Sequence, residues 1–262
     1  MSEASLQTEF QPLTPAEIED PAITQKKALS SVKDLEEKNW SRPVAMEDVI
    51  DTERKERAAT LMHSFSEGAV DVVRSVARRN KLPANYRFPH VRIGDNSGVD
   101  ARYAYSVNTQ DGQPTKIVRS EIVVDAKRLD SLAQDDPSAI YEIHRENSDG
   151  TETIIQVGTP QEMAYTNGAE EAAHSIFLYQ DVANGKFRPN KSTGSGGMDT
   201  AAYDAQPMEY HGRGWQVRAI LDAKNEGKIS AEKAERLTKP FIDRIQAAAK
   251  YKRDRKSSEL SS

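Results

Sequence analysis

The residues best suited to chemistry lie in one acidic segment, TNGAEEAAHSIFLYQ, residues 166–180. Glu170 and His174 are four residues apart, so on a helix they share one face and could hold the same metal ion. Glu171 would then project beside that ion, where a general base takes a proton from metal-bound water. A third ligand would have to come from another segment of the chain.

These residues carry a resemblance to a known family. The EEAAH stretch, residues 170–174, resembles the HExxH signature of zincin metallopeptidases, with Glu170 in place of the first histidine. Further on, PMEYHGRGW, residues 207–215, is similar to the Pro-x-Glu-x-x-(Ala/Gly) stretch by which many compact bacterial zincin-like domains present a glutamate ligand. The resemblance spans roughly residues 51–227.

The resemblance implies a function and a set of site residues. The expected function is zinc-dependent hydrolysis of peptide bonds by a metal-activated water. The implied base is Glu171, and the implied zinc ligands are His174, Glu209 and the atypical Glu170. A second carboxylate puts more negative charge on the metal and lowers its power to acidify bound water. We therefore expect the hydrolysis to be weak or absent.

Two other interpretations of the segment stay open. Acids in a first helical turn are favoured by the helix dipole, and Asn167 followed by Glu170 is ordinary capping chemistry, so the acids need no metal. The chain would then be a non-catalytic interaction or scaffold protein on a degenerate metallopeptidase fold. A further alternative concerns the ligand set, because His211 lies two residues after Glu209 and only one of the two should face a site on a helix.

Other motifs carry less chemistry. Ser195 lies in a glycine-rich stretch, residues 193–197, that is typical of a flexible loop and could form a flap near the cleft. The oxygen-rich segment of residues 94–100 lacks EF-hand spacing, so we interpret it as a turn. Nucleotide-binding glycine patterns are absent from the sequence.

Composition limits the classes of partner. The net charge is −5 with the signs mixed, so we expect neither nucleic acid nor a membrane as a partner, but a protein or peptide substrate or binding partner. The chain has no cysteine, which excludes thiolate metal sites. It shows no apolar run near the roughly 20 residues of a membrane span and no signal-peptide core. The expected location is cytoplasmic, or exported without a classical signal peptide.

Hydrophobic spacing predicts the elements that position these residues. After Asp51, apolar residues recur every three or four positions and predict a helix that stops near Asn80 and Pro83. Its stripe consists of Leu61, Phe65, Ala69, Val72, Val73 and Val76. Alternating strands around Asp111-Gly112 and around Asp149-Gly150 then predict two hairpins, and hence a mostly antiparallel sheet.

The motif segment itself is predicted to be helical. Thr159 and Glu162 form a capping box, which predicts a helix that runs on toward Gly185. Asn167 is an alternative start, because Gly168 lies in the middle of that range. After a flexible connection over residues 186–206, Pro207 opens the helix that carries the glutamate ligand. A last helix begins at Ser230 and is interrupted by Pro240.

The sequence thus predicts an α+β, zincin-like fold in one domain. We expect residues 1–50 to form a disordered N-terminal arm, residues 51–248 the domain, and residues 249–262 a basic and polar disordered tail.

Overall fold

The computed structural model describes residues 54–94, 100–146, 152–188 and 200–259. The expected arm, residues 1–50, and the expected flap, residues 193–197, lie outside this part of the chain. The elements are α3 (Lys55–Arg78), β1 (His90–Gly94), β2 (Ala101–Gln110), β3 (Gln113–Asp125), α4 (Ala126–Gln134), β4 (Tyr141–Glu146), β5 (Glu152–Gly158), α5 (Pro160–Ala183), α6 (Thr200–Asp204), α7 (Pro207–Asn225) and α8 (Ala231–Glu259). The chain is therefore an α+β protein, as expected.

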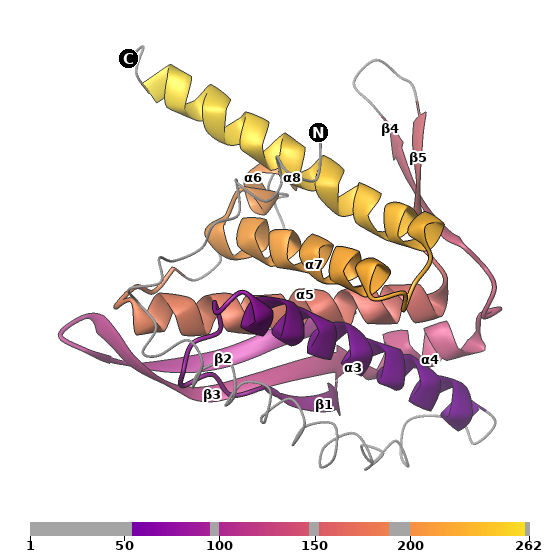
Figure 1. Ribbon diagram of the computed structural model, residues 1–262, viewed down its shortest axis with the longest axis horizontal. Helices are drawn as coiled ribbons and strands as arrows, with labels where there is room; N and C mark the ends of the chain where they lie inside the picture. Colours follow the sequence, from indigo (N-terminus) through magenta and orange to yellow (C-terminus); the bar gives the residue numbers. More distant parts are fainter. Residues whose placement is uncertain (1–53, 95–99, 147–151, 189–199, 260–262) are drawn as a thin grey trace.

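Helix α5 is the centre of the fold. It packs against α3, against α7 and against strands β2 and β3. In Figure 1 the sheet lies below α5, while α7 lies above it and α8 covers the far side of α7. The predicted apolar stripe of α3 is buried in full, and this explains why α3 packs so closely against α5.

The sheet differs from the prediction in one strand. β2 and β3 form the expected antiparallel hairpin, whose turn at Asp111 and Gly112 has positive φ angles of 52° and 76°. β1, however, pairs parallel to β3, and the sheet order is β1-β3-β2. The three-stranded sheet is therefore mixed, although both expected antiparallel hairpins are present, with β4 and β5 as a separate pair.

Helix α5 begins at the first of its two predicted starts. The Thr159 side chain accepts a hydrogen bond from the Glu162 amide, and Glu162 returns one to the Thr159 amide, which completes the capping box. Asn167 is an interior residue, so the alternative start is wrong. The glycine that suggested it has a packing role: a Cβ on Gly168 would lie 1.8 Å from the Phe65 carbonyl oxygen of α3.

The last helix is longer than predicted. Pro240 lies inside α8 without ending it, and the helix continues to Glu259. Residues 249–259, expected to belong to a disordered tail, are thus helical, and their lysines and arginines are good helix formers. The short helices α4 and α6 were not predicted. Within the described ranges, no helix is both long and apolar enough to cross a membrane.

Candidate metal centre

The structure brings together the three residues that the sequence proposed as ligands. Glu170 and His174 lie one turn apart on α5, and Glu209 lies in the first turn of α7, the neighbouring helix in Figure 1. One ligand atom from each lies within 4.8 Å of the other two. For any such triangle, a point exists within about 2.8 Å of all three atoms, whereas zinc bonds to these donors are about 2.0 to 2.2 Å long. The three donor groups would therefore have to come somewhat closer together to hold an ion.

His174 turns its Nε2 atom toward this point. The atom is buried and lies 3.5 Å from Glu209 Oε2, an ion-pair distance that is long for a hydrogen bond. The other ring nitrogen, Nδ1, lies 3.5 Å from Glu171 Oε2. A carboxylate on the far nitrogen is the arrangement that orients metal-binding histidines in proteins. The imidazole thus presents Nε2 to the two ligand carboxylates.

Glu171 is held away from the ligand atoms. Its Oε2 atom accepts a hydrogen bond of 2.6 Å from the backbone amide of Tyr103 in β2, and its side chain is buried. The Glu171 carboxylate therefore links α5 to strand β2 of the sheet. It lies on the side of the His174 ring that carries Nδ1. The structure does not group Glu171 with the three ligand atoms, although the sequence placed it beside the metal as the base.

Sequence reasoning missed a buried arginine at the same site. The guanidinium of Arg213, only 1% exposed, lies 3.0 Å from Glu170 Oε1 and 3.2 Å from Glu209 Oε2. It also lies 3.0 Å from Asp204 Oδ1, and Arg244 binds the same carboxylate. Arg213 follows Glu209 by four residues, and this i to i+4 spacing of opposite charges was the available sequence signal.

The short helix α6 completes the surroundings of Glu209. Tyr203 donates a hydrogen bond of 2.7 Å to Glu209 Oε1, and Asp204 from the same helix is 1% exposed. Both residues fall in the segment expected to be a flexible connection. Glu209 is thus oriented from two sides, by the hydroxyl of Tyr203 and by the guanidinium of Arg213.

The charges of the cluster leave room for a divalent cation. With His174 neutral, the four carboxylates exceed the two guanidinium groups by two negative charges; these groups are Glu170, Glu171, Asp204, Glu209, Arg213 and Arg244. Burying net charge is costly, so a cation is favoured here. In the ion-free site a proton on His174 removes half of this excess, and a divalent ion in place of that proton would balance the excess in full.

The same charged groups also change the pKa of the His174 imidazole. Burial alone lowers the pKa of this imidazole, but the charges of Glu209 and Glu171 outweigh burial and raise the pKa well above 6.5. Burial also raises the pKa of Glu209, while His174 and Arg213 together bring it down to about 2. The ion-free site therefore favours an imidazolium opposite ionised carboxylates.

The alternative ligand His211 does not join the site. Its ring stacks on Phe177 at 5.5 Å between centroids and meets Tyr210 edge to face at 6.0 Å. Burial lowers the pKa of His211 to about 4, with further lowering by Lys252. Glu209 and His211 thus point to different environments, as their two-residue spacing on a helix predicts. Ser195 lies outside the described residues, as do positions 95–99 of the oxygen-rich segment.

The group of Glu170, His174 and Glu209 could thus hold a metal ion, with Arg213 as a competing cation. Comparison of the chain with protein-family models, with curated proteins and with solved structures found no match.

Proposed function

We propose that this chain is a zincin-like metallopeptidase domain that holds zinc through His174, Glu209 and Glu170. One observation carries the proposal: three zinc-type donors from two helices lie within 4.8 Å of one another around the buried imidazole of His174. In the ion-free site Nε2 of this imidazole lies within ion-pair distance of Glu209, and zinc would take the place of the Nε2 proton beside the same carboxylate.

When bound, zinc would supply a water of lowered pKa and a positive charge that polarises the peptide carbonyl. The residues around it have separate tasks. Glu209 is fixed by Tyr203 and Arg213, so its carboxylate needs little ordering on binding. Arg213 holds both ligand carboxylates in the ion-free site, so zinc binding would have to loosen its contact with at least one of them.

In this proposal Glu171 is the general base. To act, its carboxylate has to turn from the Tyr103 amide toward the Nε2 side of His174. Catalytic groups often reach their reacting geometry only when substrate is bound. Until it turns, Glu171 serves to orient the imidazole. The expected rate is low, because Glu170 adds a negative charge where an intact motif has a neutral histidine.

The experiment compares Glu171→Gln with the wild type, both loaded with zinc, on an unfolded protein substrate. Glutamine keeps an oxygen for the Tyr103 amide but cannot take a proton. We expect hydrolysis to be lost while zinc content is unchanged. Glu235→Gln, on the exposed side of α8, is the matched control and should leave the rate unaltered. A rate in Glu171→Gln equal to that of the wild type would reject the assigned base.

A second candidate function rests on Arg213. Its guanidinium already neutralises part of the charge of Glu170, Glu209 and Asp204, as a structural ion pair does in a protein that has no metal. The chain would then be a non-catalytic scaffold that keeps a metallopeptidase-like frame and binds a protein or peptide partner. Purified protein that takes up no zinc and hydrolyses no peptide would favour this candidate.

A further inference from the structure

The guanidinium of Arg213 lies between the proposed ligands and a further acid. Its Nη1 atom lies 3.0 Å from Glu170 Oε1, on the ligand side. Its Nη2 atom lies between two carboxylates, 3.2 Å from Glu209 Oε2 and 3.0 Å from Asp204 Oδ1. The Nε atom donates to the same Asp204 oxygen at 3.1 Å. Arg213 therefore already contacts an acid that is not among the three proposed ligands.

A metal ion would compete with Arg213 for one oxygen atom. Glu209 Oε2 lies 3.2 Å from Arg213 Nη2 and 3.5 Å from His174 Nε2, so the oxygen that faces the imidazole is also held by the guanidinium. Arginine stays charged in proteins, and the side chain of Arg213 is only 1% exposed to water. A buried charge without a partner is costly. When a metal takes Glu209 Oε2, the guanidinium therefore needs another carboxylate.

Asp204 of α6 is placed to supply this carboxylate. Its side chain is 1% exposed, and its Oδ1 atom already accepts a hydrogen bond from Arg213. The preceding residue on α6, Tyr203, donates to Glu209 Oε1, the other oxygen of that ligand. Tyr203 can thus keep Glu209 oriented while Oε2 changes partner. Arg213 can leave Glu209 without losing every buried partner, because Asp204 remains.

A second arginine limits the hold of Asp204 on Arg213. Arg244 of α8 donates to Asp204 Oδ2 from Nε at 2.7 Å and to Oδ1 from Nη2 at 2.6 Å. Asp204 Oδ1 therefore lies within reach of three nitrogen atoms, two of Arg213 and one of Arg244. A carboxylate oxygen offers about two lone pairs, so these donors compete. Arg244 thus weakens the contact between Asp204 and Arg213 and leaves Arg213 more firmly on the ligands.

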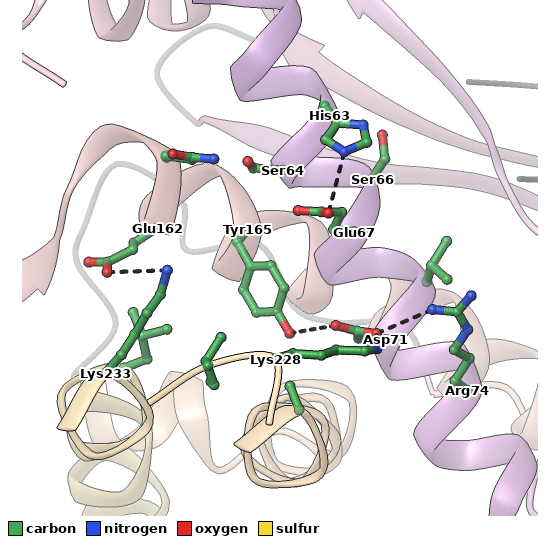
Figure 2. A pocket seen from close by; sticks show the side chains of 15 residues that line it. His63, Ser64, Ser66, Glu67, Asp71, Arg74, Glu162, Tyr165, Lys228 and Lys233 are labelled. Carbon is green, nitrogen blue, oxygen red and sulfur yellow. Dashed lines mark hydrogen bonds and ion pairs between the residues drawn. The ribbon is translucent and has the colours of Figure 1, made fainter. Parts of the chain in front are cut away.

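Arg244 belongs to a helix that other contacts hold in place. Near its start, α8 binds Glu162 of α5 through Arg236 and through Lys233, whose Nζ atom lies 3.5 Å from the carboxylate. Figure 2 shows the Lys233 pair at the wall of a cavity of about 660 Å³ around Ser64. Helix α8 also packs against α7. The side chain of Arg244 is 32% exposed, so its replacement should leave α8 in place.

We propose that Asp204 is a positioning residue of the metal site, which holds the Arg213 guanidinium when a metal ion takes the ligand carboxylates. Arg244 sets how strongly Asp204 does so. Neither Asp204 nor Arg244 is a ligand, and both act through Arg213. The inference rests on the proposed zinc site. It adds to that site an exchange of partners by one buried cation, controlled from α6 and α8.

The exchange predicts opposite effects for the two partners of one ion pair. Asp204→Asn keeps the shape of the side chain but removes its charge, so Arg213 should stay on the ligand carboxylates. Zinc affinity should then fall about 10- to 100-fold. Arg244→Gln should leave Asp204 to Arg213 and raise zinc affinity about three- to fivefold, the scale of one partly exposed ion pair. If the two residues only supported the fold, neither change would raise the affinity.

The experiment is competitive titration of the full chain with zinc against a chromogenic chelator, for the wild type, Asp204→Asn and Arg244→Gln. Circular dichroism without metal checks that each variant is folded. Arg244→Gln also removes a positive charge, which alone would favour a cation through space. The two causes are separated by repeating Arg244→Gln in the Arg213→Met variant, where no guanidinium remains for Asp204 to hold. There the rise in affinity should disappear, whereas a through-space effect would persist.

Lys239→Gln is the matched control, because it removes a positive charge from an exposed position of α8 and should leave zinc affinity unchanged. A wild type that binds no zinc would overturn the proposed function, and this inference with it. A wild type that binds zinc, with an affinity that Arg244→Gln does not raise, would overturn this inference alone. A rise of equal size with and without Arg213 would do the same. If Asp204→Asn does not fold, the Arg244→Gln measurements decide.

Discussion

Gly212 of α7 lies directly against the imidazole of His174. A Cβ atom built on this glycine would come within 3.0 Å of the ring Cδ2 atom and 3.3 Å of Nε2. The absent side chain thus makes room for the ring that faces Glu209. This contact also explains why a small residue, Gly212, stands three positions after Glu209 in PMEYHG, residues 207–212.

The first prediction concerns Gly212→Ala. The added methyl group should push the imidazole away from the ligand carboxylates and lower zinc affinity about 10- to 100-fold, the range seen when groups that orient a ligand are lost. The cost in unfolding free energy should be about 1 to 3 kcal/mol, as for other overpacked sites. Zinc titration and denaturant unfolding measure the two effects.

The control for this variant is Ala219→Gly on the same helix. It should lower the unfolding free energy by about 2 kcal/mol, through helix propensity and the loss of a buried methyl group, and leave zinc affinity unchanged. Equal zinc affinity in Gly212→Ala and the wild type would contradict the assigned position of the His174 ring.

A second prediction concerns the contact between α3 and α5. A Cβ on Gly68 would lie 1.9 Å from the Tyr165 carbonyl oxygen, the counterpart of the contact between Gly168 and Phe65. Either Gly68→Ala or Gly168→Ala should therefore lower the unfolding free energy by about 3 kcal/mol or more, since the helices must move apart. Chemical denaturation measures this.

Alanine is the better helix former, so helix propensity alone predicts the opposite sign for these two variants. Gly227→Ala is the control, because no atom lies within 4 Å of the added Cβ. It should cost only about 1 kcal/mol, from its positive φ of 72°. A stabilised Gly168→Ala would show that the two helices do not approach as closely as described.

A third prediction concerns Arg213→Met. Removal of this buried guanidinium leaves Glu170, Glu209 and Asp204 with less compensation, so the unfolding free energy without metal should fall by about 3 to 5 kcal/mol. Saturating zinc should recover more stability in this variant than in the wild type, because the ion replaces the lost cation. Thermal unfolding with and without zinc measures both.

Arg218→Met serves as the control on the same helix. Its guanidinium lies 5.3 Å from the centre of the Trp215 ring, a contact worth about 1 kcal/mol. If zinc gives Arg213→Met no more stability than it gives the wild type, the guanidinium and the metal do not share one site.

A fourth prediction concerns Glu170→His, which restores the HExxH spacing. The change removes one negative charge from the ligand set, and we expect kcat/KM for peptide hydrolysis to rise about tenfold or more, which corresponds to about 1.4 kcal/mol in the barrier. Glu170→Gln removes the same charge without supplying an imidazole and should not show the rise. An inactive Glu170→His with full zinc content would contradict a latent peptidase.

The sequence predicted those parts of the site that depend on local spacing. Glu170 and His174 share a helical face because of their separation, and the capping box at Thr159 fixed where that helix begins. Pro207 likewise opened the helix of Glu209.

Features that depend on distant residues could not be predicted. Arg213 binds Glu170, which is 43 residues away in sequence, and Glu171 turns toward Tyr103, which is 68 residues away. The spacing of residues around Glu170 and Glu171 does not indicate either of these contacts. The parallel pairing of β1 and the cavity around Ser64 likewise arise only when separate elements pack together.

The most direct test of the central claim is the zinc content of purified protein after removal of metal and reloading, measured by mass spectrometry for the wild type, His174→Ala and His211→Ala. The account predicts one zinc per chain in the wild type and in His211→Ala, and none in His174→Ala. A wild-type protein without zinc, or a His174→Ala variant that holds as much as the wild type, would contradict it.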